Sequence, residues 1–147
     1  MQCEKVKKSD TMNTNISDTI RYVGVDDLEL DLFESQYIVP NGISYNSYLI
    51  FDEQVALMDA VDCRMCDEWL EKVQVALAGR TPDYLVVHHM EPDHSGSIVE
   101  ALKRYPKMKI VSSARAIQML GQFFDGVDFS HNTLVVKEGD ALSLGSR

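Results

Sequence analysis

HHMEPDHSGS, residues 88–97, is the stretch of this sequence that decides the fold. It gathers three of the chain's four histidines and two acidic residues in one short segment. The apolar run 83–88 before it predicts a strand, and the helical spacing of apolar residues over 97–105, closed by Pro106, predicts a helix. A loop that joins a strand to a helix presents its side chains from a rigid frame, so this segment is the candidate functional site.

Four residues of this loop are candidate metal ligands: His89, Glu91, Asp93 and His94. Imidazole and carboxylate groups are donors that transition metals accept, and Pro92 stiffens the turn, so that little entropy is lost when a metal binds. In an extended chain alternate residues share a face, which groups the first three ligands and turns His88 away from them. The fourth lies where the loop becomes a helix and alternation no longer applies.

A purely structural interpretation uses the same residues. Asp93 or Ser95 would cap the following helix, Glu91 would be solvated, and the histidines would form hydrogen bonds at the strand end. The high density of potential metal ligands in this segment favours metal binding, since ordinary surface segments rarely place four such residues so close together.

Outside this loop, strands and helices alternate. Residues 66–77 carry apolar side chains at helical spacing and are followed by Gly79, which predicts a helix that ends there. Three further elements are predicted after the loop: a strand at 108–111, a helix at 114–124 and a strand at 133–136.

The region before residue 66 is predicted to be mostly β. Period-two alternation and the Pro40-Asn41-Gly42 turn signal predict strands at 20–25, 28–39, 44–51 and 55–61. Strands first and alternating elements later indicate an α+β fold, with one mixed sheet and helices on its outer face. Residues 1–18 are polar and aperiodic, so we expect a disordered tail there and a single domain over 19–147.

Bulk properties limit the partners. A net charge of -9 and a pI near 4.8 disfavour nucleic acid or an anionic membrane surface, because their phosphates would be repelled. The sequence has no apolar run long enough to span a membrane and no secretory signal, so we expect a cytoplasmic location. Three cysteines are an odd number for a disulfide framework and suit a reducing compartment.

The loop resembles the H-x-[EH]-x-D-H motif of the metallo-β-lactamase superfamily, and Glu91 followed by HSGS resembles its flavodiiron branch. Residues 32–62, 109–124 and 136–145 are similar to other segments of that family. The resemblance implies a four-layer αββα sandwich with two non-haem irons that reduces O2 to water or NO to N2O. It implies that His89 and Glu91 bind one iron, that Asp93 and His94 bind the other, and that His88 faces outward or supports the ligands.

The same resemblance implies partners and missing parts. Electrons would come from FMN on a separate flavodoxin-like domain, supplied by a donor such as rubredoxin or a flavin reductase, and the full-length protein would be a homodimer. The similarity covers the N-terminal half of the metal domain, without the family's two later histidines, its bridging aspartate or the FMN domain. We therefore expect half of a metal site, an inactive isolated chain, and a sheet that leaves an apolar face and an edge uncovered.

Glu91 is the residue that favours iron over zinc. Hydrolytic relatives carry histidine in this position, a neutral donor suited to zinc, whereas a carboxylate adds negative charge and a hard oxygen that offset the charge of oxidised iron. The prediction is a di-iron oxidoreductase. A zinc-type hydrolase of the same fold and a non-catalytic remnant are the alternatives.

Several residues outside the loop are weaker candidates for function. Cys63-Arg64-Met65-Cys66 is a C-x-x-C at a predicted helix start, which could support redox exchange or half a zinc site; without a second pair we interpret it as incidental. His131 lies in a predicted turn and matches no family ligand. Trp69, Phe123 and Phe124 are predicted to pack in the core. Tyr37, Tyr45 and Tyr48 could line a pocket for O2 or NO, but aromatic residues in strands usually pack, so no role is assigned to them.

Overall fold

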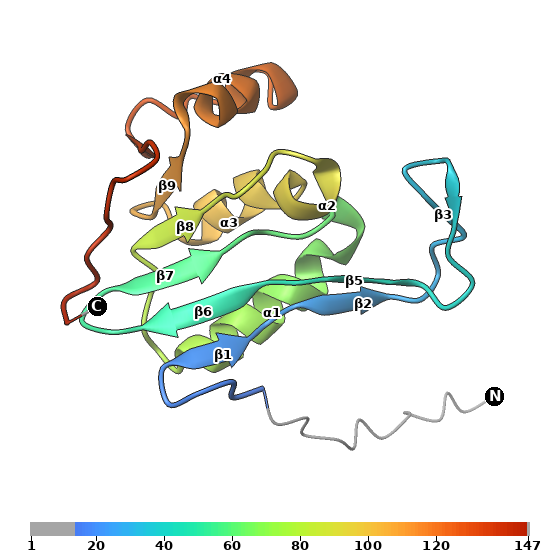
Figure 1. Cartoon of the computed structure of the whole chain (residues 1–147), viewed down its shortest axis with the longest axis horizontal. Coiled ribbons are helices and arrows are strands. Elements are labelled where there is room, and N and C mark those ends of the chain that lie inside the picture. Colours follow the sequence, from blue (N-terminus) through green and yellow to red (C-terminus); the bar gives the residue numbers. More distant parts are fainter. Residues whose placement is uncertain (1–13, 147) are drawn as a thin grey trace.

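The fold is built on one six-stranded mixed sheet, as predicted. The computed structural model describes residues 14–146, so most of the expected tail lies outside the described residues and remains a prediction. The sheet contains, in spatial order, β1 (Ile20–Tyr22), β6 (Tyr48–Phe51), β7 (Val55–Met58), β8 (Tyr84–Val86), β9 (Lys109–Ser112) and β10 (Thr133–Val135). The first three are antiparallel and β7 to β10 run parallel (Figure 1).

The change from antiparallel to parallel pairing follows from the connections. A short turn joins β6 to β7, whereas each parallel neighbour needs a crossover, which a helix usually supplies. The crossovers contain α1 (Cys66–Leu77), then α2 (Pro92–Ser95) with α3 (Ile98–Arg104), then α4 (Ala114–Phe123). Figure 1 shows α1 and α3 behind the sheet, so one face of the strands is covered by helices.

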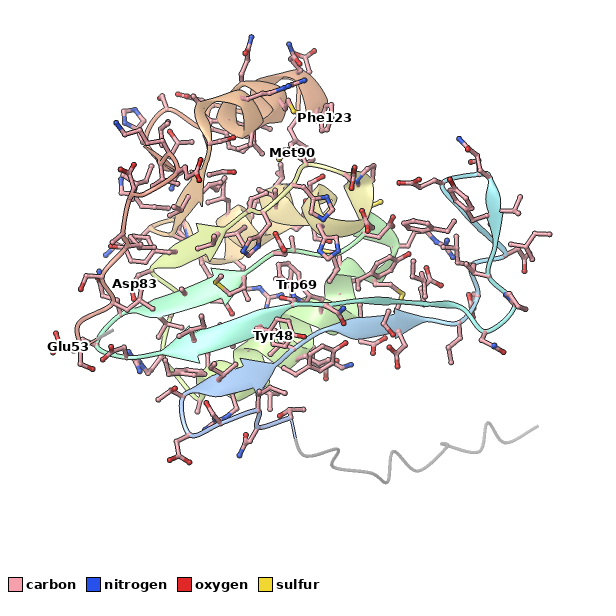
Figure 2. All side chains as sticks on the ribbon, viewed as in Figure 1. Tyr48, Glu53, Trp69, Asp83, Met90 and Phe123 are labelled. Atoms are coloured by element: carbon pink, nitrogen blue, oxygen red, sulfur yellow. The ribbon has the colours of Figure 1, made fainter. Side chains whose placement is uncertain are left out.

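A row of aliphatic side chains crosses the sheet on its helix-covered face. Four residues that pair in register across neighbouring strands are fully buried: Leu49, Leu57, Leu85 and Ile110. Helix α1 contributes Trp69, Leu70, Val73 and Leu77 to the same core. In Figure 2, Trp69 lies near the centre of the molecule. Its indole Nε1 donates a hydrogen bond to Ser47 Oγ at 3.0 Å, which satisfies the only polar atom of this buried ring.

Helix α1 has the predicted length and ending. It begins directly after a 3-10 turn, η1 (Cys63–Met65), and its first turn carries Asp67 and Glu68, which favour the positive end of the helix dipole. Ala78 at φ 49° and Gly79 at φ 91° take the left-handed conformation that ends helices. The predicted end of the helix at Gly79 is confirmed. The left-handed conformation already begins one residue earlier, at Ala78.

The predicted strand over 28–39 is wrong. The structure forms a two-stranded sheet from β2 (Val25–Asp27) and β5 (Ile43–Tyr45), and a separate small hairpin from β3 (Leu32–Phe33) and β4 (Tyr37–Ile38). Glu34 and Ser35, at φ 50° and 58°, reverse the chain between β3 and β4. Neither residue is the glycine or asparagine usual in such turns. The period-two pattern therefore predicted one continuous strand where the chain in fact reverses.

Two of the aromatic packing predictions are wrong. Tyr37 and Phe123 are 59% and 51% exposed, whereas Tyr45 is buried. Tyr37 lies on the two-stranded hairpin, which has no sheet behind it, and α4 buries Ala116 and Leu120 while Phe123 lies at its outer end (Figure 2). Amphipathic spacing alone could not show which helix face would meet a partner.

The second face of the main sheet is less covered. Tyr48, Met58 and Val86, in register on the face opposite the Leu49 row, are half-buried, and Leu134 and Val135 of edge strand β10 are exposed. This agrees with the expected apolar face and edge. Among the described residues, the helices are too short and polar for any of them to cross a bilayer.

Candidate metal centre

The candidate ligands lie where the loop after β8 becomes a helical turn. Sequence reasoning predicted a loop here, but Pro92–Ser95 form α2, so Asp93 and His94 project from a helix. Pro92 suits the first helical turn, where its missing N–H is not needed, and Glu91 precedes it in an extended conformation. The Ser95 hydroxyl donates to Met90 O at 2.9 Å and fastens the turn to the loop before it.

Three of the predicted ligands converge on one point. His89, Glu91 and Asp93 each offer a ligand atom, and these atoms lie within 4.8 Å of one another. His89 Nδ1 and Glu91 Oε2 approach to 2.7 Å, yet His89 Nδ1 takes part in no hydrogen bond. Two metal-binding atoms that lie close together without a hydrogen bond between them are placed as two ligands of one cation would be.

His94, the fourth predicted ligand, joins the same cluster. Its ring centroid lies 4.6 Å from that of His89, and its Nε2 lies 3.5 Å from Asp93 Oδ2. Asp93 Oδ1 and His94 Nδ1 are buried without a hydrogen-bond partner among the described residues. Buried polar atoms normally have partners because desolvation costs about 1–3 kcal/mol per group. A bound cation would provide the missing partner, so the residues fit a metal.

The cluster is open on one side. The side chains of Glu91 and His89 are 65% and 41% exposed, whereas those of Asp93 and His94 are 16% and 17% exposed. Two imidazoles and two carboxylates form a mixed nitrogen and oxygen donor set that suits iron or zinc. The exposed side leaves room for a small exogenous molecule.

Asp59 is a component of the site that sequence reasoning missed. Its Oδ1 accepts a hydrogen bond from His88 N at 2.8 Å, and its Oδ2 lies 2.9 Å from His88 Nδ1 and 3.8 Å from His94 Nδ1. Asp59 has φ 58°, a strained conformation for a residue other than glycine and one often found at functional sites. Asp59 directly follows β7, which pairs parallel with β8, so the carboxyl ends of these strands meet at one edge. The sequence carried no signal for this contact, because the predicted strand over 55–61 ran past Asp59 and only the structure shows which strands pair.

The segment after Asp59 is hydrogen-bonded to α2 and to the residues that follow it. Ala60 N donates to His94 O at 3.1 Å, and Ser97 N donates to Val61 O at 3.0 Å. A Cβ on Gly96 would lie 2.7 Å from Cys63 N, so only glycine allows the two segments to pack this closely. The ligands of α2 are therefore held by a second segment of the chain.

The structural interpretation of the loop as a helix cap is wrong. Helix α3 follows Ser97, and neither Ser97 nor Glu91, the residue before α2, makes a side-chain capping hydrogen bond. Ser95 bonds to Met90 instead. His88 is exposed and contacts Asp59, outside the group formed by His89, Glu91 and Asp93, and His131 is exposed in a turn.

A cavity of about 120 Å³ adjoins the cluster. Its walls include Phe33 and Glu34 of the β3–β4 hairpin, Tyr45, and the ligand candidate Asp93. The Tyr45 hydroxyl donates to Asp27 Oδ2 at 3.2 Å. Burial, and then the nearby carboxylates of Asp62 and Asp27, raise the pKa of Tyr45, so its phenol stays neutral.

Replacing Asp59 with alanine is expected to destabilise the chain by about 1–3 kcal/mol, because the His88 N–H loses its acceptor within the protein and alanine is strained at positive φ. Asp59→Asn is the matched control, since asparagine keeps an acceptor oxygen and tolerates this conformation. Urea unfolding followed by circular dichroism measures both variants. Equal losses for the two would show that the charge, rather than the hydrogen bond and the backbone, determines the effect.

The chain is similar to known proteins in both sequence and fold. The family model described as ODP family beta lactamase matches residues 43–147. Diflavin flavoprotein A 1 of Synechocystis sp. is 34% identical over 139 residues, which cover 95% of this chain and 24% of that protein. The anaerobic nitric oxide reductase flavorubredoxin of Vibrio vulnificus is 30% identical over 92% of this chain and 27% of its own length.

A solved structure agrees with these relatives. Rubredoxin oxygen:oxidoreductase of Desulfovibrio gigas matches with a TM-score of 0.84 and 32% identity, over 91% of this chain and 33% of its own. The chain thus spans about a quarter to a third of the length of these three proteins.

Proposed function

Because this chain belongs to the ODP family of beta-lactamase domains, we propose that it is part of a flavodiiron-type oxidoreductase and supplies the first ligands of its iron centre. The observation that carries the proposal is the convergence of His89, Glu91 and Asp93, with His94 beside them. The carboxylate of Glu91 favours iron, because an anionic oxygen offsets the charge of an oxidised ion.

We assign the ligands in two pairs, with His89 and Glu91 toward one iron and Asp93 and His94 toward the other. When bound, iron supplies the one-electron redox chemistry that reduction of O2 or NO requires. The chain's own residues then have separate tasks. Asp59 holds His88 and the end of the loop, while Glu91 and His89 lie at the exposed side, where a small molecule can approach.

The cavity beside Asp93 supports a small substrate. Its volume of about 120 Å³ has room for a diatomic molecule beside Asp93. The relatives named for nitric oxide reduction and for oxygen reduction are consistent with either gas as substrate. For the whole protein we propose FMN on a further domain, a rubredoxin or flavin reductase as electron donor, and a homodimer.

Anaerobic metal loading tests this function. The chain is incubated with Fe(II), Zn(II) or both, desalted, and analysed for metal, with circular dichroism to confirm folding. Because most nitrogen and oxygen sites bind Zn(II) more tightly than Fe(II), the expected result with Fe(II) alone is partial retention of iron, with fewer than two ions per chain. Zinc retained in preference to iron, with an ester or lactam hydrolysed, would support the zinc-hydrolase alternative, and no retention of either metal would support a non-catalytic remnant.

Replacing Glu91 with histidine is expected to raise the ratio of retained zinc to retained iron roughly tenfold, because a hard anionic donor becomes a neutral imidazole. Metal analysis after loading with both ions measures the ratio. Glu53→His is the matched control, since Glu53 lies at the other end of the sheet from Met90 (Figure 2). An unchanged ratio in Glu91→His would remove Glu91 from the ligand set.

A further inference from the structure

We propose that Cys63 and Cys66 form a reversible dithiol–disulfide pair at the start of α1. This redox-sensitive modification site lies next to the metal loop, residues 88–97, which carries the candidate metal ligands. Sequence reasoning interpreted this C-x-x-C as incidental. The inference goes beyond the proposed function and does not depend on it, because it concerns two thiols that bind no metal in that scheme.

The backbone brings the two cysteines to one side of a single helical turn. Cys63 opens η1, and Cys66 N–H donates to Cys63 O before continuing as the first residue of α1. Residues three positions apart in a helical turn are neighbours. A C-x-x-C at the start of a helix is the arrangement in which thiol–disulfide exchange is favoured.

The two thiols have unequal surroundings, which suits an attacking and a resolving cysteine. Cys63 is exposed and can meet a disulfide in solution, whereas Cys66 is buried in the core and cannot. Burial raises the pKa of the Cys66 thiol, and a hydrogen bond with Ser97 offsets part of the shift. The raised pKa keeps the Cys66 thiol protonated at neutral pH.

The exchange with a small disulfide such as oxidised glutathione is balanced in two steps. The Cys63 sulfur, having lost its proton, attacks one glutathione sulfur; the S–S bond breaks, a mixed disulfide forms and one glutathione thiol leaves. Cys66 then loses its proton and attacks the Cys63 sulfur, which releases the second glutathione thiol. The protein loses two hydrogen atoms, and one glutathione disulfide is reduced to two thiols.

The pair touches the segments that support the metal loop. The Ser97 hydroxyl donates to Asp62 O at 3.2 Å and also contacts the Cys66 thiol. Gly96 packs against the backbone nitrogen of Cys63. Since α2 lies directly before Gly96, closing the disulfide changes the support under Asp93 and His94.

The test uses the full chain with Cys3 replaced by serine, so that Cys63 and Cys66 are its only thiols. The folded protein is incubated with oxidised glutathione and analysed by thiol counting and intact mass. We expect both thiols to be lost, a mass lower by two hydrogens, no glutathione adduct, and full recovery with dithiothreitol. A product that retains one glutathione, or a disulfide-linked dimer, would overturn the pairing.

Single variants in the same background identify the roles. Cys66→Ser should stop at a mixed disulfide on Cys63, and Cys63→Ser should react roughly tenfold more slowly, since the buried thiol must attack first. Equal rates for the two variants would contradict the assignment. Backbone amide exchange over residues 88–97 should differ between the reduced and oxidised chains, and identical exchange would contradict the coupling to the metal loop.

Discussion

Replacing Asp93 with alanine is expected to lower the affinity of the chain for Fe(II) by roughly a hundredfold or more. Asp93 is the less exposed of the two carboxylates in the cluster, and its Oδ1 is buried without a hydrogen bond. Its Oδ2 also lies 3.5 Å from His94 Nε2, and it belongs to the group of ligand atoms formed with His89. Its removal takes away a charge and a donor atom that no other described residue replaces.

The same substitution should leave the metal-free chain as stable as before, or more stable by about 1 kcal/mol, because a buried acceptor without a partner is removed. A lower affinity for Fe(II) without a lower stability distinguishes a metal ligand from a structural residue. Competition titration of Fe(II) against a coloured chelator gives the affinity, and urea unfolding in a chelator gives the stability. Asp125→Ala, an exposed aspartate after α4, is the control for loss of charge. Unchanged iron affinity with lowered stability would make Asp93 a structural residue.

Replacing Trp69 with alanine is expected to lower the free energy of unfolding by about 3–5 kcal/mol. Trp69 is fully buried between α1 and the sheet, so its loss leaves a large cavity and an unpaired Ser47 hydroxyl lone pair. The Ser47 hydroxyl in turn donates to Asp59 O at 2.8 Å. The variant should therefore also loosen the segment that holds the metal loop.

Urea unfolding followed by circular dichroism at the peptide wavelength measures this loss, since the fluorescent residue is itself removed. Val75→Ala is the matched control on the same helix, because Val75 is 74% exposed and a surface change costs within about 0.5 kcal/mol. Trp69→Phe keeps most of the packing and loses the hydrogen bond, so about 1–2 kcal/mol is expected. A loss for Trp69→Ala no larger than that for Val75→Ala would contradict the packing described for α1.

Much of the architecture could be predicted because it depends on local pattern. Apolar spacing and the following glycine placed α1 at the correct residues, and alternating elements predicted the mixed sheet. The motif predicted a metallo-β-lactamase-like fold, which the likeness to the Desulfovibrio gigas structure confirms. The turn at Glu34-Ser35 was not predicted, because glutamate and serine do not indicate the positive φ angles that both residues adopt there.

The sequence by itself determined which candidate ligands are available, since His89, Glu91, Asp93 and His94 lie within one short segment, and the structure brings the first three within 4.8 Å of one another. Only the tertiary structure decided what holds that loop. Asp59 meets His88 from 29 residues away, through the parallel pairing of β7 with β8. Spacing along the chain predicts contacts within a few residues, whereas a contact across a sheet depends on which strands pair and in what register.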